Sequence, residues 1–178
     1  MTDSLFFDSD CISASLWVGK ENLLVKLYSG RIVIPKPVYE ELSYPGIAHL
    51  KAKVDTLLSA EQAKVEAISM ESETYELYYQ LTETPQGGHA IIGKGEAASI
   101  ALAKSSDGIV ASNNLKDISS YIDEFCLKHL TTGDILLEAL GKGYISEPQG
   151  NMIWDSMLAK RRKLGAPSFT AYIQTKQK

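Results

Sequence analysis

Polar and acidic side chains stand at the ends of segments predicted as strands. Asp8 directly follows the apolar run at residues 5–7, and the apolar segment 108–112 ends in Ser112 and leads into Asn113 and Asn114. A carboxylate that follows a fully apolar strand is expected to be partly buried, where its charge is costly unless it is paired or bound to a cation. Asp8 is therefore the leading candidate for a functional group.

Two further acids stand near the ends of predicted elements. Glu41 and its neighbour Glu40 follow the segment "PKPVY", and Glu96 comes just after Gly93 and Gly95. Taken singly, Glu96 is explained as a carboxylate that complements the positive end of its helix dipole, and Glu41 as a solvent-facing helix residue. The residue types alone leave both a structural and a functional explanation open.

The elements that would position these groups alternate along the chain. Strands are predicted at residues 5–8, 108–112 and 65–70, and at 31–37, where Pro35 favours an edge strand or an extended linker. Helices are predicted at 20–30, 75–85, 94–108, 116–125, 132–143 with Thr132 as N-cap, and 151–165. This alternation predicts a three-layer α/β/α fold with a central parallel sheet. In such a sheet, ligands bind beyond the carboxyl ends of the strands, where Asp8 and Asn114 would lie.

Composition narrows the class of protein. The chain has 178 residues, 44% hydrophobic content and a formal net charge of −4, which is typical of one globular domain and unlike a dedicated nucleic-acid binder. No apolar run approaches the roughly 20 residues that span a bilayer, so no membrane association is expected. The N-terminus lacks the basic and apolar segments of a signal peptide, which predicts a cytoplasmic protein. Two isolated cysteines and three scattered histidines argue against a local zinc motif.

Four segments in order resemble the PIN domain, the ribonuclease fold of VapC-type toxins. They are "LFFDSDCIS", "IPKPVYEEL", "IGKGEAASIALAKSSDGIVASNNLKDI" and "LTTGDILLEALGKGYIS". The third segment is the most discriminating, because an acid after a first strand occurs in many α/β folds. The resemblance implies a PIN-like nuclease domain at residues 1–147 and a C-terminal helical extension of the same domain at 148–178.

The resemblance also implies roles for particular residues. Asp8, Glu41, Glu96 and Asn114 would be the catalytic set, with Asp8, Glu96 and Asn114 holding Mg²⁺ or Mn²⁺. Family members typically place a carboxylate where Asn114 stands. The amide still offers an oxygen ligand but removes one negative charge, so weaker cation binding is expected. Asn113 and Asp117 would support the site, and Asp117 would reach it through a water molecule.

The function implied by the resemblance is metal-dependent hydrolysis of RNA phosphodiester bonds. It further implies the toxin of a toxin–antitoxin pair, with an antitoxin protein as partner and a homodimer as the assembly. A PIN fold weakened by Asn114 and used only to bind RNA or protein is the alternative. A remote alternative is a dinucleotide-binding protein, because "GKGEAA" fits the glycine template but lacks a substantial preceding strand.

Substrate contacts are expected from hydroxyl and basic side chains. Ser112 lies beside the candidate site, and Lys160, Arg161 and Arg162 belong to the dense basic run that ends at Lys163. On the sequence alone, this run is better explained as a solvated helix face. His89 is predicted to lie beside Glu96 within reach of substrate. The two tryptophans and the tyrosines of "YELYY" are predicted to pack in the core rather than to stack on bases.

Overall fold

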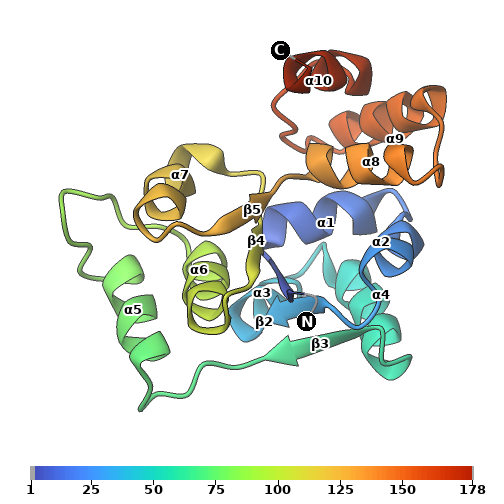
Figure 1. The fold of residues 1–178 in the computed structure, drawn as a ribbon. Coiled ribbons are helices and arrows are strands. Elements are labelled where there is room, and N and C mark those ends of the chain that lie inside the picture. The colour runs from blue at the N-terminus through green and yellow to red at the C-terminus, as the bar shows by residue number, and fades with distance from the viewer. Residues whose placement is uncertain (1–2, 178) are drawn as a thin grey trace.

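The computed structural model describes residues 3–177, and its centre is a five-stranded, all-parallel sheet. The strands are β1 (Leu5–Phe7), β2 (Ile32–Pro35), β3 (Ala63–Glu66), β4 (Ile109–Ala111) and β5 (Lys128–Leu130). Their order across the sheet is β3-β2-β1-β4-β5. Helices cover both faces, as Figure 1 shows, so the predicted three-layer α/β/α fold is confirmed.

Helices connect the strands and continue to the C-terminus. They are α1 (Ser9–Trp17), α2 (Glu21–Tyr28), α3 (Lys36–Glu41), α4 (Ala48–Ser59), α5 (Glu73–Thr82), α6 (Lys94–Ser106), α7 (Leu115–Glu124), α8 (Thr132–Gly141), α9 (Glu147–Ala159) and α10 (Phe169–Lys176). In the part of the chain that the structure describes, no helix is long and apolar enough to cross a membrane.

Side-chain alternation along the short strands divides the interior into two main cores. Leu5 and Phe7 of β1 pack with α1 to α4 and α8, whereas Phe6 between them packs with α5, α6 and α7. Ile34 and Val33 of β2 divide in the same way. Because successive strand residues point to opposite faces, these apolar runs require helices on both sides of the sheet.

The order of strands in the sheet changes direction at the boundary between β1 and β4. β2 and β3 are added on one side of β1, and the chain then returns to place β4 on the other side. Phe7 and Ala111, the last residues of the two strands, are register partners. The Asp8 amide donates to the Ala111 carbonyl at 3.0 Å. This is the topological switch point of the sheet, where α/β proteins bind their ligands.

Several predictions about the elements were wrong in detail. Pro35 ends a fully buried internal strand, paired with β3 through Glu66, and is not part of an edge strand or linker. The edge strand β3 ends at Glu66, several residues before the predicted end. The N-cap of α8 is Thr131 and not Thr132, because the Thr131 hydroxyl accepts a hydrogen bond from the Asp134 amide in a capping box. The strand β5 and the helices α1, α3, α4 and α10 were not predicted as separate elements.

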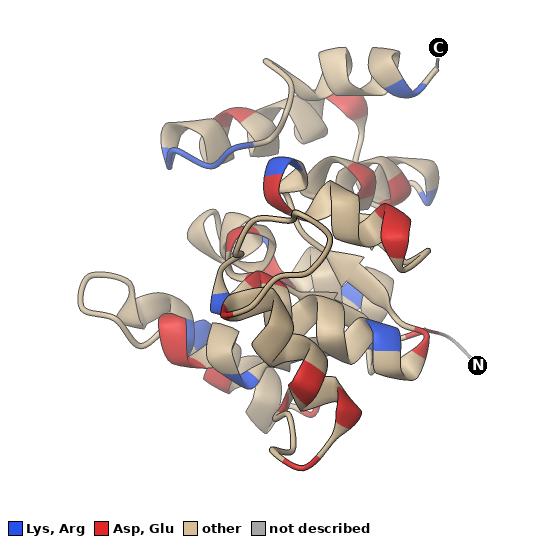
Figure 2. Cartoon of the chain, turned by 90° about the vertical axis from the view of Figure 1, so that its left-hand side faces the viewer, with Lys and Arg blue, Asp and Glu red and all other residues tan. Residues whose placement is uncertain are grey.

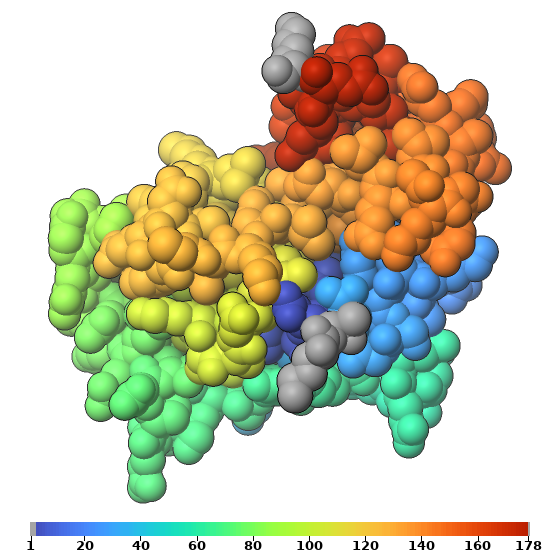
Figure 3. Space-filling model, in the orientation of Figure 1, coloured from blue at the N-terminus to red at the C-terminus, as the bar shows by residue number. Residues whose placement is uncertain are grey.

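The C-terminal helices form a third core with the body of the protein. Trp154 of α9 is fully buried and packs against Phe169 and Tyr172 of α10, together with Ala14 of α1 and Leu136 of α8. In Figure 3 the orange atoms of α8 and α9 lie directly against the blue atoms of the first helices, and the red atoms of α10 lie on the orange ones. The proposed boundary between residues 147 and 148 stays a prediction.

Candidate active site

Asp8 is buried at the end of β1 with one oxygen unpaired. Its side chain is 1% exposed and caps α1, because Oδ1 accepts a hydrogen bond from the Cys11 amide at 2.7 Å. Oδ2 has no hydrogen-bond partner among the described residues. Burial raises the pKa of Asp8 to about 7, although the Ser112 hydroxyl and the Cys11 amide oppose the rise, and the negative charge of Glu96 adds to it. The helix cap gives Oδ1 a structural role, but it does not explain why Oδ2 is buried without a hydrogen-bond partner among the described residues.

Asn114 connects two acids beside Asp8. Its Nδ2 donates to Glu96 Oε1 at 3.2 Å and to Asp117 Oδ2 at 2.7 Å. Its backbone amide donates to the Ser112 hydroxyl at 3.1 Å, which fixes the corner after β4. Asp117 therefore contacts Asn114 directly.

Glu41 lies on the other side of Glu96. The Ser9 hydroxyl donates to Glu41 Oε2, which joins the start of α1 to the end of α3. Partial burial raises the pKa of Glu41, the Ser9 hydroxyl and the Gly95 amide lower it, and the charge of Glu96 raises it. Glu40, by contrast, is exposed and pairs with Lys36 at the surface. Of the two adjacent acids, Glu41 is the one that faces Ser9 and Glu96.

Gly95 permits the close approach of α6 to α1 and α3. A Cβ at this position would lie 3.2 Å from both Ser9 Oγ and Val38 Cγ2, and 3.4 Å from Glu41 Oε1. The glycine therefore brings the start of α6, which carries Glu96, against the two other acid-bearing elements. Asp8, Glu41 and Glu96 converge here from three separate segments of the chain.

Asn113 connects the loop after β4 to the start of α8. Its Oδ1 accepts from the Thr132 amide at 2.8 Å, and its Nδ2 donates to the Thr132 hydroxyl at 2.9 Å. His129 Nε2 contacts the Ser112 carbonyl oxygen at 2.9 Å, and burial lowers the pKa of this histidine. Asn113 and His129 thus fasten the loop after β4 to β5 and α8, which holds Asn114 in place.

The basic run lies in a turn and not on a helix face. α9 ends at Ala159, so the predicted helix was too long at its C-terminus and Lys160 is only its C-cap. Arg162 contacts Asp10 Oδ1 at 3.8 Å and the Ser13 hydroxyl at 3.4 Å. Figure 2 shows this turn as the blue loop of the upper helices, whereas other basic residues on that face are interspersed with acids. The run is anchored to α1, the helix that Asp8 caps.

His89 lies against α7. Its Nε2 is 2.7 Å from Glu124 Oε2, and its ring packs against Tyr121 with the centroids 4.6 Å apart. These contacts explain the histidine structurally. The loop 85–93 that carries it, and not a strand, precedes α6. The strand required by a dinucleotide-binding fingerprint is therefore missing before "GKGEAA".

The aromatic residues mostly pack as expected. Trp154 is fully buried, and Trp17 is partly buried with its ring 4.8 Å from that of His49. Tyr78 packs against the core under α5. The prediction was wrong for Tyr79, which is 48% exposed.

The oxygen ligands near Asp8 suit a hard cation, although the set is small. Within residues 3–177, no three Asp, Glu, His or Cys side chains are arranged to hold a metal ion together. The buried, unpaired Oδ2 of Asp8 is nevertheless the kind of group that a divalent cation satisfies, and Glu96 and the Asn114 amide lie beside it. Two carboxylates and one amide oxygen fit Mg²⁺ or Mn²⁺, which keep several water ligands.

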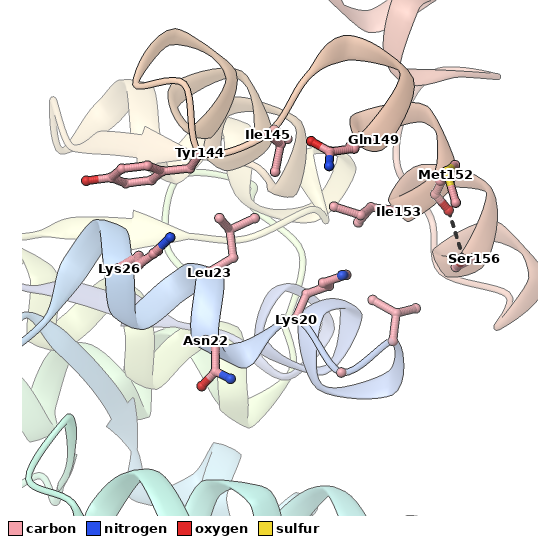
Figure 4. Close-up of a pocket in the computed structure, with 12 residues that line it drawn as sticks. Lys20, Asn22, Leu23, Lys26, Tyr144, Ile145, Gln149, Met152, Ile153 and Ser156 are labelled. Carbon is pink, nitrogen blue, oxygen red and sulfur yellow. Dashed lines mark hydrogen bonds between the residues drawn. The ribbon is translucent and has the colours of Figure 1, made fainter.

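Two cavities lie outside this site. The larger, of about 790 Å³, lies between α2 and α9, and Figure 4 shows its lining. The smaller, of about 380 Å³, is bordered by Asn113, His129 and Tyr172. Neither is lined by Asp8, Glu41 or Glu96.

Ser9 and Gly95 belong to the site but were not predicted as site residues. Ser9 bonds Glu41, and Gly95 allows α6 to approach. The signal for Ser9 was its position directly after Asp8, which placed it at the same edge of the sheet. The signal for Gly95 was a glycine in the first turn of an otherwise alanine-rich helix, where a close contact is the usual reason.

Comparison with known proteins agrees with this geometry. No curated protein matches the sequence significantly. A family model described as a PIN domain matches residues 5–176, which include all five strands and the acidic edge, that is, Asp8, Glu41, Glu96 and Asn114. The chain therefore belongs to the PIN-domain family.

Proposed function

We propose that this protein is a metal-dependent endoribonuclease whose active site is the edge formed by Asp8, Glu41, Glu96 and Asn114. The observation that carries the proposal is the unpaired Oδ2 of Asp8, buried at the switch point of the sheet beside a second carboxylate. Membership of a family of nuclease-type domains supports hydrolysis of phosphodiester bonds as the reaction.

Asp8, Glu96 and the Asn114 amide oxygen are the proposed ligands of Mg²⁺ or Mn²⁺. When bound, the cation would lower the pKa of a coordinated water and neutralise charge on the phosphate. Asp8 is held by its helix cap, so its free oxygen has a fixed direction. Rotation of the Asn114 side chain by half a turn would exchange its Nδ2 for its oxygen toward Glu96.

Glu41 is proposed to orient and deprotonate the attacking water. Burial and the charge of Glu96 raise the pKa of Glu41, which makes it a better proton acceptor than an exposed glutamate. The Ser9 hydroxyl donates to one of its oxygens and fixes the side chain. Ser9 is accordingly a positioning residue.

RNA is proposed to reach the site along the α1 side of the molecule. Lys160, Arg161 and Arg162 would neutralise phosphates of the RNA. The predicted contact of Ser112 with substrate does not fit the structure, because Ser112 is fully buried and its hydroxyl accepts from the Asn114 amide. Ser112 is instead proposed to support the site. The bond of Arg162 to α1 places this basic turn next to the helix that begins at Asp8. Because the chain has a net charge of −4, we expect its contacts with RNA phosphates to be concentrated at this basic turn.

A second candidate is a PIN fold that binds RNA or protein without cleaving it. The observation in its favour is the Asn114 amide, which pairs with Glu96 and Asp117 and replaces the charge of a fourth acid. The absence of three clustered Asp, Glu, His or Cys metal ligands among residues 3–177 points the same way. The two candidates differ in one property, namely cleavage that requires a divalent cation.

The test is cleavage of a mixed RNA pool by the purified chain, with Mn²⁺ or with EDTA. If the protein is a nuclease, the wild type should produce RNA fragments only with Mn²⁺. Asp8→Asn should produce none, because the asparagine keeps the helix cap but removes the anionic ligand. Ser15→Ala, in the same helix, is a matched control and should cleave like the wild type. RNA binding without fragments under every condition would favour the binding module.

The assembly and cellular role are proposed on the basis of family membership alone. They comprise a homodimer, a toxin role with an antitoxin as partner, and a division into residues 1–147 and 148–178. Light scattering of the purified chain tests the dimer, and co-purification with the product of an adjacent gene tests the antitoxin. A monomer without such a partner would contradict both.

A further inference from the structure

The larger cavity lies between α2 and α9, and none of its residues belongs to the acidic edge. Its volume of about 790 Å³ is within the range of roughly 300–1,000 Å³ found for small-molecule sites. Leu23, Ile145 and Ile153 form its apolar wall and point toward its centre in Figure 4. The walls come from two helical units, so a ligand here would contact both.

The charged side chains that line this cavity are both lysines. Lys20 and Lys26 form no ion pair within residues 3–177. The ammonium of Lys26 lies 5.0 Å from the centre of the Tyr144 ring, which keeps it at the cavity. Since acids outnumber bases 22 to 18 in the chain, a cavity lined only by positive charge departs from the overall composition.

The nearest acids in the sequence are bonded elsewhere. Glu21, between the lining residues Lys20 and Asn22, pairs with Lys53 of α4 at 3.4 Å. Glu147, at the start of α9, accepts a hydrogen bond from Thr170 of α10. Neither lines the cavity. The positive charge is therefore open to a ligand from solution.

Gln149 adds a hydrogen-bond donor at the same place. Its Oε1 accepts from the Ser146 amide at 2.8 Å, which fixes the side chain as part of a capping box. This bond turns Nε2 toward the space between α9 and α2, as Figure 4 shows. A fixed amide N–H and two lysines together suit a carboxylate or another small anion.

We propose that this cavity binds a small amphipathic anion, with its acidic group between Lys20, Lys26 and Gln149 and its apolar body against Leu23 and Ile153. The apolar wall and the unpaired cations each match one half of such a molecule. The volume of about 790 Å³ between α2 and α9 is that of a small-molecule site, which favours a small molecule as the occupant. Binding would join the two helical units and raise the melting temperature.

The test is a calorimetric titration of the full chain with decanoate below its micelle concentration. We expect saturable binding, accompanied by a rise in melting temperature. The double variant Lys20→Gln/Lys26→Gln should weaken binding by about tenfold or more, because it removes both cations. Lys64→Gln, an exposed lysine of β3, is the matched control and should bind like the wild type. The neutral analogue 1-decanol should bind more weakly than decanoate.

Two results would overturn the proposal. One is the absence of decanoate binding to the wild-type chain. The other is equal affinity of the wild type and the double variant, since both lysines are exposed and their replacement leaves the fold intact. If decanoate does not bind, binding of an acidic, leucine-rich peptide would assign the cavity to a protein partner. RNA cleavage does not enter this test, so its outcome is independent of the nuclease proposal.

Discussion

Asn114 donates a hydrogen bond to Glu96 across the edge of the sheet, with 3.2 Å between Nδ2 and Oε1. The bond joins the loop after β4 to the first turn of α6, so a neutral amide and not a carboxylate faces Glu96 there. The amide thus stabilises the acidic edge in the absence of a cation and reduces its negative charge. The balance between these two effects can be measured.

Asn114→Asp should be less stable than the wild type without metal. The new carboxylate would lose both amide hydrogen bonds and face Glu96 and Asp117, at a cost of about 1–3 kcal/mol in the free energy of unfolding. Urea unfolding in EDTA measures this cost, and saturating Mn²⁺ should reduce it. Asn114→Ala removes the same bonds without adding charge and separates repulsion from bond loss. Equal stability of Asn114→Asp and Asn114→Ala in EDTA would mean that the acids do not repel.

Asp8 should make the metal-free protein less stable as the pH rises. Burial raises its folded-state pKa from 3.8 to about 7, so the folded form holds a proton that the unfolded form has already lost. Protonated Asp8 therefore adds to the free energy of unfolding. This contribution is fully present below about pH 4, and up to about 4 kcal/mol of it is lost between about pH 4 and 7. Asp8→Asn lacks this loss and should gain stability relative to the wild type across that interval. Parallel pH curves for the two proteins in EDTA would contradict the burial of a carboxylate.

Ser9→Ala should shift the pH dependence of cleavage. The Ser9 hydroxyl lowers the pKa of Glu41, so removal of the hydroxyl should raise that pKa further. The acid limb of the pH–rate profile should then move to higher pH. Ser15→Ala, on the same helix but not bonded to Glu41, is the control. An unshifted acid limb in Ser9→Ala would exclude Glu41 as the proton acceptor.

Gly133→Ala should loosen the C-terminal helices. A Cβ at Gly133 would overlap the ring of Tyr172, which docks α10 onto α8. Overpacking of this kind costs about 1–3 kcal/mol. Gly141→Ala at the end of the same helix meets no atom within 4 Å and should be neutral or slightly stabilising. Thermal unfolding of both variants checks the prediction, and similar melting temperatures would show that α10 adjusts freely.

The basic turn should determine how salt affects RNA binding. Replacing Lys160 and Arg161 with glutamine removes two charges, which should reduce the slope of log affinity against log salt by about 1.4 for single-stranded RNA. The double variant Lys64→Gln/Lys142→Gln makes the same change in net charge on β3 and after α8, and should leave the slope nearly unchanged. Fluorescence anisotropy at four salt concentrations measures it. If the two double variants have equal slopes, the turn is not the RNA contact.

The layered fold could be predicted because apolar runs and alanine-rich helices alternate in the sequence. β1 and β4 consist of consecutive apolar residues, and a strand buried on both faces requires such a run. β5, with the sequence Lys-His-Leu, was missed because one of its three residues is apolar and its place is fixed by pairing with β4. Pro35 was misassigned because it stands at the last strand position, where the missing N–H is tolerated.

The site residues that follow strands could be predicted from the sequence. Contacts that depend on the packing of helices distant in the sequence could not. Asp8 and Asn114 follow the adjacent strands β1 and β4, so topology alone brings them together. The bond between Ser9 and Glu41 joins α1 to α3 beside the close approach of α6 that Gly95 permits, and no local pattern shows either contact. His89 was placed beside Glu96 by its sequence separation, whereas the loop before α6 carries it to α7.

The most direct test of the nuclease proposal is the single-turnover rate of RNA cleavage measured against Mn²⁺ concentration for the wild type, Asp8→Asn and Asn114→Asp. We expect the wild type to cleave only with the cation and Asp8→Asn to be inactive at every concentration. Asn114→Asp should reach half its maximal rate at a lower Mn²⁺ concentration than the wild type, because an anionic ligand replaces a neutral one. Cleavage by Asp8→Asn at the wild-type rate, or no cleavage by the wild type at any concentration, would contradict the account.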